Sequence, residues 1–347
     1  MDPGELDGER NQPEMSHPVH LSLACGDYDI HRGLIEGSVR PQGIDLTVLT
    51  YPTPPRQWRM DRHSEFDICE FSMSSYLLVH ERQLLGQEMA MEPVMAIPVF
   101  PHRRFRHSFI FVNTRAGIRT PKDLEGRKVG LRSWQATAGL WARGILQDEH
   151  GVDLKRVIWC PSDVEAVSEA ADPPGYDIRR VQDGRSITRM LLEGEVDALI
   201  YPEMPDALLA GDDRIARLFP DYKQEEMAYY TKTGFFPIMH TVVIKQSILK
   251  ANPWVARNVL VALRESKDLA FDRMRDPRSI SLAWVRELID EQLEVLGQDP
   301  WDYTFEGNEA AIRTMIRYSL EQGILTQPVT PEALFAASTL GELPAYH

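Results

Sequence analysis

The stretch VMAIPVFPHRRFRHSFIFVN, residues 94–113, decides how the chain is organised. Its two ends are apolar and rich in β-branched and aromatic residues, which is typical of buried strands. Its middle carries three arginines and two histidines within six positions. Pro98 and Pro101 place a bend after the first apolar run, because proline cannot donate a ladder hydrogen bond. We therefore expect a basic bend held between two buried strands.

The basic bend predicts an anion site, because it contrasts with a chain whose formal net charge is −14. Arginine suits a carboxylate because its planar fork binds both oxygens at once. Strands on either side of the bend would hold such side chains in place. The alternative is a solvated bend whose arginines pair with surface carboxylates. We take Arg103 and Arg106 as the carboxylate anchors of this stretch.

Length and composition narrow the class of protein. A chain of 347 residues can form two domains. Its 52 acidic against 38 basic residues argue against a nucleic-acid partner. No run of apolar residues is long enough to span a membrane, so we expect no membrane partner. Cys25, Cys69 and Cys160 have neither metal nor redox spacing, so we expect reduced, buried thiols and a cytoplasmic location.

Strands and helices alternate along most of the chain, which indicates an α/β fold. The segments EFDICEFSMSSYLL (65–78) and EVDALIYPEMPDALL (195–209) both combine an apolar strand, a polar tip and a helix. This repetition predicts two lobes, each a mixed sheet flanked by helices, with a cleft between them. We expect a disordered leader at residues 1–17, which lack the apolar core of a secretion signal. The chain would cross between lobes twice, so that residues 18–112 and 240–347 form the first lobe and residues 113–239 the second.

The sequence resembles the 4,5-dihydroxyphthalate decarboxylase family. The resemblance runs in order from about residue 21 to residue 325, and its longest motifs are EFDICEFSMSSYL, IPVFPHRRFRHSFIFVNTRAGI and TGFFPIMHTVVI. Shorter matching motifs are LSLACGDYD, VRPQGIDL, LWARGILQDEHGV, GEVDALI and RLFPD. The resemblance implies a type 2 periplasmic-binding-protein-like fold. It also implies non-oxidative removal of one carboxylate from 4,5-dihydroxyphthalate, which gives protocatechuate and carbon dioxide.

Such a reaction needs cationic anchors for the carboxylates, an acid for the ring carbon and a base for a ring hydroxyl. Arg132 follows a predicted strand, and a polar helix start comes next, where free N–H groups favour an anion. We therefore expect four further substrate-binding residues: Arg132, Ser133, Gln135 and Thr137. Ser133 is equally suited to capping that helix.

His107 and His240 are the candidates for proton transfer, since both lie at the expected lobe crossings and imidazole titrates near neutral pH. For each, a satisfied place in the core is an equal alternative. Asp27 and Glu70 are the carboxylate candidates, although Asp27 lies in a turn after a strand, where capping a helix is its favoured role. Burial could raise the pKa of Glu70. Residues at polar strand tips could bind the catechol hydroxyls: Tyr28, Ser72, Ser74, Tyr201 and Glu203.

Two other interpretations remain open from the sequence. A catechol can chelate a divalent metal, but the ten histidines form no HExxH-like helical pair, so we expect no metal or other cofactor. A non-catalytic solute-binding protein for a small aromatic carboxylate is the alternative function. The long helical C-terminal third offers surface for a homodimer.

Overall fold

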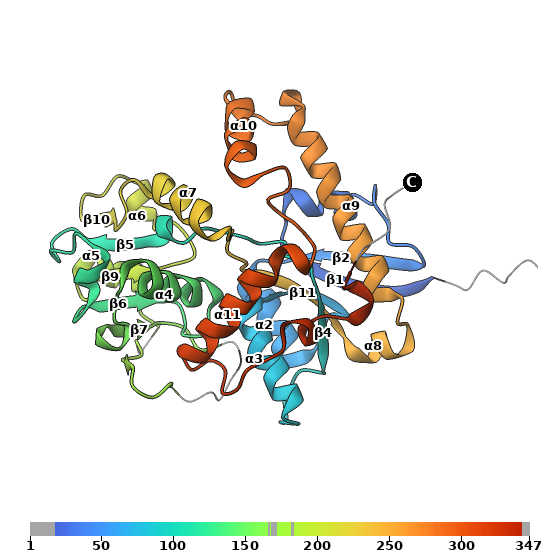
Figure 1. Ribbon diagram of the computed structural model, residues 1–347, viewed down its shortest axis with the longest axis horizontal. Helices are drawn as coiled ribbons and strands as arrows, with labels where there is room; N and C mark the ends of the chain where they lie inside the picture. Colours follow the sequence, from blue (N-terminus) through green and yellow to red (C-terminus); the bar gives the residue numbers. More distant parts are fainter. Residues whose placement is uncertain (1–17, 166, 168–171, 182–183, 342–347) are drawn as a thin grey trace, which may run out of the picture.

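The computed structural model describes residues 18–165, 167, 172–181 and 184–341. The predicted leader, residues 1–17, lies outside the described residues. Two mixed sheets form two lobes, which lie side by side and are flanked by helices (Figure 1). No helix of the described ranges is both long and apolar enough to cross a membrane.

The first sheet has the strand order β2-β1-β3-β11-β4. The parallel strands are β1 (Val19–Cys25), β2 (Ile44–Thr50) and β3 (Ile68–Ser72). β11 (His240–Lys245) returns antiparallel between β3 and β4 (Val94–Ile97). The sheet therefore gains a strand from the sequence that directly follows the second lobe, as a discontinuous lobe requires.

The second sheet has the order β10-β5-β9-β6-β7-β8. Its parallel strands are β6 (Lys128–Leu131), β7 (Ile158–Pro161), β8 (Asp177–Ile178) and β9 (Ala198–Ile200). β5 (Ile110–Asn113) runs antiparallel to β9 and to β10 (Ile215–Arg217). All six strands come from the sequence between β4 and β11, so the second sheet is built entirely from the inserted part of the chain.

Helices cover both sheets. Around the first sheet lie α1 (Arg32–Ile35), α2 (Thr53–His63), α3 (Met73–Leu84), α8 (Gln246–Ala251) and α9 (Val255–Arg275). The second carries α4 (Thr137–His150), α5 (Ile187–Glu193), α6 (Asp206–Leu209) and α7 (Tyr222–Thr233). In α9, Val255, Val259 and Leu263 recur at helical spacing and are buried in the core that includes strands of the first sheet. α10 (Val285–Leu296) lies at the end of the molecule where α9 projects (Figure 1).

The C-terminal helix α11 (Glu309–Glu321) joins the lobes rather than covering the first lobe alone. It packs against α3 and α4, and Figure 1 shows it lying between the two sheets. The Tyr318 ring of α11 meets Trp141 of α4 edge-on, with centroids 5.8 Å apart. One buried apolar cluster includes residues of both lobes and of α11. The two lobes therefore share a core behind the cleft.

The organising stretch forms two strands, as predicted, but its middle is not extended. β4 and β5 occupy its ends, while His107–Phe109 forms a 3₁₀ turn immediately before β5. Because a turn does not alternate between two faces, strand parity cannot decide where the side chain of His107 points. The backbone between β4 and β5 carries the chain from the first sheet to the second.

Candidate active site between the lobes

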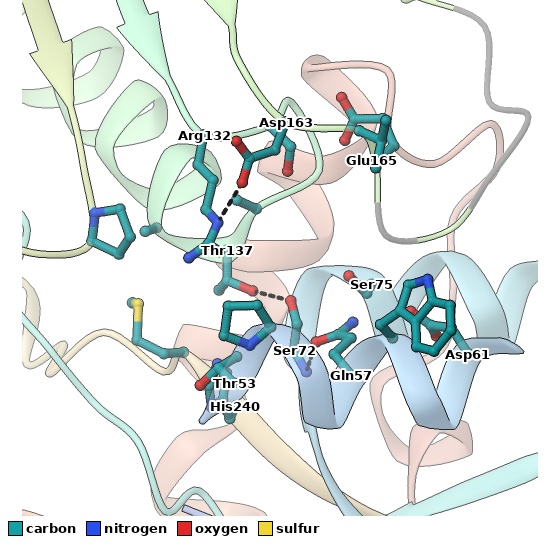
Figure 2. A pocket seen from close by; sticks show the side chains of 18 of the residues that line it. Thr53, Gln57, Asp61, Ser72, Ser75, Arg132, Thr137, Asp163, Glu165 and His240 are labelled. Carbon is teal, nitrogen blue, oxygen red and sulfur yellow. Dashed lines mark hydrogen bonds and ion pairs between the residues drawn. The ribbon is translucent and has the colours of Figure 1, made fainter. Parts of the chain in front are cut away.

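A cavity of about 560 Å³ lies between the two lobes. The first lobe lines it with α2 and with the junction of β3 and α3. The second lobe lines it with the segments that follow β6 and β7, at the carboxyl ends of parallel strands (Figure 2). Ligands of open α/β sheets bind at such strand ends. The two stretches that connect the lobes contribute His102, Arg106, Met239 and His240.

His240 and Glu70 form a hydrogen-bonded pair beside this cavity. His240 begins β11 opposite Ser72 of β3, so Glu70, two residues earlier in β3, is its diagonal neighbour on the same face. Nδ1 of His240 lies 2.5 Å from a carboxylate oxygen of Glu70. His240 lines the cavity, whereas Glu70 lies behind it. With Nδ1 engaged by Glu70, Nε2 is the ring nitrogen that a bound ligand can reach.

Glu70 is a buried carboxylate with four partners. Besides His240, it accepts hydrogen bonds from the amide of Gly26 (2.7 Å) and the hydroxyl of Tyr28 (2.9 Å), and Arg56 lies 3.0 Å away. Burial acts to raise the pKa of Glu70, but the charge of Arg56 and the hydrogen bond of His240 hold it well below its usual range. The effect of burial on the pKa of Glu70 is therefore outweighed, and the expected net rise in that pKa is wrong. Glu70 is charged and positions His240.

A second histidine packs on His240. The His102 ring meets His240 edge-on at a centroid distance of 4.8 Å, and both rings line the cavity. Burial, followed by the neighbouring His240, lowers the pKa of His102 to about 2. Nδ1 of His102 is buried and has no hydrogen-bond partner among the described residues. His102 is therefore a neutral ring that shields one side of His240 from water.

Arg106 brings a buried positive charge into the cavity. Its Nε donates to the carbonyl of Phe105 (2.9 Å), and its guanidinium lies over the ring of Phe109. Nη2 is buried without a hydrogen-bond partner, and no ion pair joins Arg106 to any residue in the described ranges. Burial, and then the charge of Arg104, lower the pKa of Arg106, yet a guanidinium stays cationic at neutral pH. A buried, unpaired cation of this kind attracts an anionic ligand.

Arg132 lies on the opposite wall and is already paired. Its Nε donates to Asp163 over 2.9 Å, and both residues line the cavity together with Ser133 (Figure 2). The side chain of Arg132 is 28% exposed, so this ion pair is partly screened by water. Arg132 is therefore placed to bind a carboxylate, in competition with Asp163.

We expect Arg132→Ala to weaken binding of a phthalate-type dicarboxylate about 3- to 10-fold, as for loss of one hydrogen bond to a partly exposed group. Binding of catechol, which has no carboxylate, should change by less than twofold. Titration calorimetry with both ligands measures this difference. An equal loss for the two ligands would contradict an anchoring role for Arg132.

The starts of α3 and α4 meet across the cleft. Oγ1 of Thr137 lies 2.9 Å from Oγ of Ser72 and 2.8 Å from Oγ of Ser74. Ser74 also donates to the carbonyl of Gln135. Ser72 and Thr137 line the cavity, whereas Ser74 and Gln135 are buried behind it. These hydroxyls join the lobes, and they bring two helix N-termini, which favour anions, to one side of the cavity.

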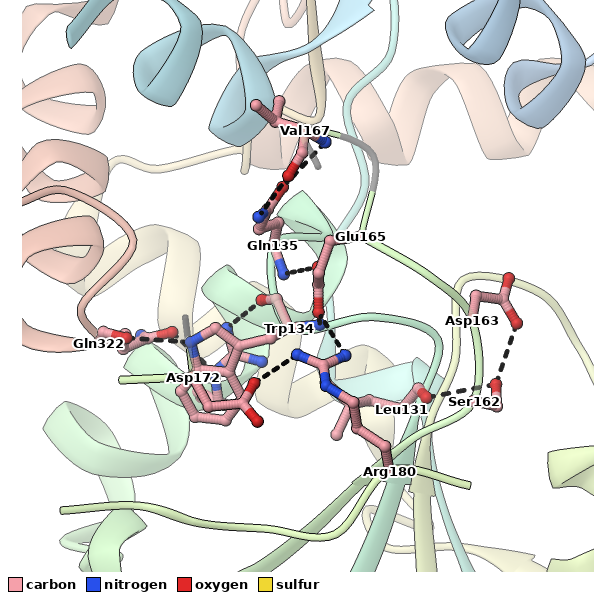
Figure 3. A network of polar contacts seen from close by, with 11 residues as sticks. Leu131, Trp134, Gln135, Ser162, Asp163, Glu165, Val167, Asp172, Arg180 and Gln322 are labelled. Carbon is pink, nitrogen blue, oxygen red and sulfur yellow. Dashed lines mark hydrogen bonds and ion pairs between the residues drawn. The ribbon is translucent and has the colours of Figure 1, made fainter. Parts of the chain in front are cut away.

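The carboxylate of Glu165 binds the two backbone amides just before α4. Its carboxylate accepts hydrogen bonds from the amides of Trp134 and Gln135, both at 2.9 Å, and pairs with Arg180 at 3.1 Å (Figure 3). The side chain of Gln135 in turn binds the backbone amide and carbonyl of Val167. The segment after β7 is thereby fastened to the start of α4. These two amides already hold an internal carboxylate.

Curated proteins with similar sequences identify the family of this chain. No family model matches the chain. The chain is 30% identical to a 4,5-dihydroxyphthalate decarboxylase of Comamonas testosteroni over 93% of its own length and 98% of the relative. It is also 30% identical to a protein of the same name from Pseudomonas putida, over 65% of the chain and 86% of the relative. The chain belongs to the 4,5-dihydroxyphthalate decarboxylase family.

Solved structures show the fold of this family member. The aliphatic sulphonate binding protein SsuA of Escherichia coli matches with a TM-score of 0.53 at 11% identity, covering 93% of the chain and 99% of that protein. The alkanesulfonate-binding protein of Xanthomonas axonopodis pv. citri matches with a TM-score of 0.52 at 12% identity, covering 94% and 99%. The predicted two-lobed, periplasmic-binding-protein-like fold is confirmed.

Two predicted residues of the basic bend in this decarboxylase-family chain lie away from the cavity. Arg103 donates to the carbonyls of Phe236 and Asp302, both at 3.0 Å, so it ties the bend to the C-terminal segment instead of anchoring substrate. His107 packs against the rings of Phe219 and Tyr229, and burial lowers its pKa to about 4. Neither lines the cavity. The predictions of Arg103 as an anchor and His107 as a catalytic residue are corrected accordingly.

The contacts of four other predicted residues show that their side chains do not face the cavity. Asp27 pairs with Arg32 at 2.8 Å on the surface, so it is not the base. Tyr28 points its hydroxyl at Glu70 rather than into the cavity. Tyr201 and Glu203 flank the cavity-lining Pro202 but do not line the cavity themselves. The second polar tip therefore contributes backbone and proline in place of the two side chains that were predicted.

Sequence reasoning missed two polar residues of α2. Gln57 and Asp61 line the cavity and are 7% and 9% exposed. Burial raises the pKa of Asp61 to about 8, against the opposing effects of Arg62 and Gln57. Their i, i+4 spacing within PRQWRMDRH was a usable signal, since it places both on one helix face.

The raised pKa of Asp61 predicts how stability changes with pH. In the unfolded chain the Asp61 carboxyl has the pKa of free aspartate, about 4. In the folded protein its pKa is about 8. Between these values the folded state binds the extra proton, so this group makes folding less favourable as pH rises. Asp61→Asn should therefore raise Tm more at pH 8 than at pH 5.

The side chains of the described residues give little support to a metal site. Within the described ranges no group of three or more His, Cys, Asp or Glu side chains is arranged to hold a metal ion. His102 and His240 are adjacent, but the only carboxylate bonded to either ring is Glu70, which Arg56 already pairs. Metal-independent activity therefore stays a prediction.

Proposed function

We propose that this protein removes one carboxylate from a dihydroxylated aromatic dicarboxylate, converting 4,5-dihydroxyphthalate into protocatechuate and carbon dioxide. The observation that carries the proposal is the meeting of His240, held by Glu70, with the unpaired guanidinium of Arg106 in one cavity. The names of the curated relatives support the same substrate class. We also retain the proposed cytoplasmic location, with which three buried free cysteines agree.

Arg106 and Arg132 supply the charge that such a substrate needs. One carboxylate pairs with the buried cation of Arg106, whose unpaired Nη2 gains a partner. Arg132 attracts the neighbouring carboxylate from the opposite wall, whereas the amides just before α4 stay with Glu165. Anchoring from two walls fixes the ring in one orientation, which is itself worth a large part of the rate.

His240 is the proposed acid. The hydroxyl para to the departing carboxylate keeps its proton, and an electron pair of its oxygen moves through the ring to the carbon that bears the carboxylate. His240 then donates the proton on Nε2 to that carbon, and the carbon–carbon bond breaks as carbon dioxide leaves. The electron pair of that bond restores the aromatic ring. Acid–base help of this kind is worth about 100- to 10,000-fold in rate.

Glu70 makes His240 suited to this cycle. Its negative charge, which Arg56 and the amide of Gly26 hold in place, fixes the imidazole so that Nδ1 faces inward. The same charge stabilises the positive imidazolium that exists before the proton is given away. His102 on one side keeps water from the ring. The arrangement is one of a catalytic histidine oriented by a buried carboxylate.

The direct test is incubation of the purified protein with 4,5-dihydroxyphthalate, followed by chromatography of the products. We expect protocatechuate in equal amounts with and without a chelator, because the described residues offer no metal-binding cluster. Loss of product with chelator would overturn the metal-independent mechanism. Tight binding of the substrate without any product would instead favour the solute-binding alternative, which the fold also permits.

A further inference from the structure

Two buried polar groups on α2 point to a part of the cavity that the proposed mechanism has not used. Oδ2 of Asp61 and Nε2 of Gln57 are buried, and neither lies within hydrogen-bond distance of a partner among the described residues, although the nearby Gln57 side chain acts to lower the pKa of Asp61. Both side chains are more than nine-tenths buried, and both line the cavity. They lie one turn apart on the same helix face. An unpaired polar group in such a place is costly, so a bound ligand that pairs it gains affinity.

The chemistry of these two groups selects a neutral partner. Gln57 uses its carbonyl oxygen to accept from the amide of Ser72 over 3.2 Å, which leaves its amide nitrogen as a donor. Asp61, with its carboxyl pKa raised to about 8 by burial, both donates and accepts at neutral pH. A ring hydroxyl also donates and accepts, whereas a carboxylate only accepts. A carboxylate pairs better with the guanidinium groups of Arg106 and Arg132.

The cavity therefore has two chemically different ends. Figure 2 shows Asp61 on the side of the cavity away from Arg132 and His240, with Gln57 and Ser72 between Asp61 and His240 in this view. Trp58, on the same helix, also lines the cavity and offers an aromatic surface to a ring. In 4,5-dihydroxyphthalate the two hydroxyls occupy the edge of the ring opposite the two carboxylates. The polarity of the ligand and that of the cavity therefore match.

We propose that Gln57 and Asp61 form the subsite that binds the two adjacent ring hydroxyls of the substrate and so determine specificity for dihydroxylated rings. This inference rests on the proposed function, because it states which end of the cavity binds the hydroxyls of that substrate. It makes α2 the specificity helix, while the arginines and His240 serve the carboxylate end.

The test compares binding of phthalate, 4-hydroxyphthalate and 4,5-dihydroxyphthalate by titration calorimetry at pH 7. For the unmodified protein we expect affinity to rise with each hydroxyl. Asp61→Asn and Gln57→Leu should each lower the preference for 4,5-dihydroxyphthalate over phthalate by about 3- to 10-fold, as for one lost hydrogen bond. Binding of phthalate itself should change by less than twofold. Glu65→Gln replaces an exposed carboxylate that does not line the cavity, and it should leave the ratio of affinities unchanged.

The outcomes separate the two proposals. If both α2 variants reduce the affinities for phthalate and 4,5-dihydroxyphthalate by the same factor, the subsite is wrong while the proposed function stands. If the unmodified protein binds neither compound and forms no protocatechuate, the proposed function itself fails. Thermal melting of each variant establishes that it is folded, and using two different positions prevents a single unfolded variant from deciding the result.

Discussion

Replacing His240 by alanine is expected to lower kcat for 4,5-dihydroxyphthalate by about 100- to 10,000-fold, the range for loss of a general acid. KM should change little, because the arginines that bind the carboxylates remain. The reason is geometric: Nδ1 of His240 is engaged by Glu70, so Nε2 is the proton donor available to a ligand in the cavity. Steady-state measurement of protocatechuate formation gives both constants.

Two companion variants make this result specific. Glu70→Gln keeps the shape of the side chain but removes its charge, so kcat should fall because the hydrogen bond that orients His240 is weakened. His107→Phe preserves the aromatic packing against Phe219 and Tyr229, and it should leave kcat within about twofold, as for a residue outside the site. If His107→Phe lost as much activity as His240→Ala, the assignment of the acid to His240 would be untenable.

Replacing Arg106 by alanine is expected to produce the second large effect. A buried charge that pairs with a ligand charge is worth about 2–5 kcal/mol, so kcat/KM should fall by about 30- to 5,000-fold. Nη2 of Arg106 is buried and unpaired within the described structure, so the ligand is the partner that satisfies it. The loss should be larger than for Arg132→Ala, because Arg132 already has Asp163.

The chain itself supplies the control for Arg106. Arg104 lies two residues away on the same bend but is exposed and does not line the cavity. Arg104→Ala should lower kcat/KM by no more than about twofold, since long-range charge effects at an exposed site are screened. Similar losses for the two variants would mean that the bend acts through its overall charge rather than through one guanidinium.

The sequence by itself determined the architecture, because the patterns that specify it are local or nearly so. The alternation of apolar strands and helices predicted most strands of both sheets, and the repetition of strand, polar tip and helix predicted two lobes. Long motifs shared with one family identified the membership that the curated relatives then showed. His240, Arg106 and Arg132 were chosen from sequence, and all three line the cavity.

Only the tertiary structure decided which members of the basic bend serve the site. Arg103, Arg106 and His107 are neighbours in sequence, but Arg103 forms an isolated β-bridge with Ile238 whereas His107 begins a 3₁₀ turn, so their side chains meet different surroundings. Arg103 meets backbone carbonyls near residue 302, and His107 meets the rings around α7, contacts that span more than 100 residues of sequence. The charge on Glu70 was likewise invisible, since Arg56 reaches it from α2, 14 residues away, and His240 from β11, 170 residues away. Local patterns therefore determine which elements form, whereas long-range packing decides which side chains share a cavity and which of them remain charged there.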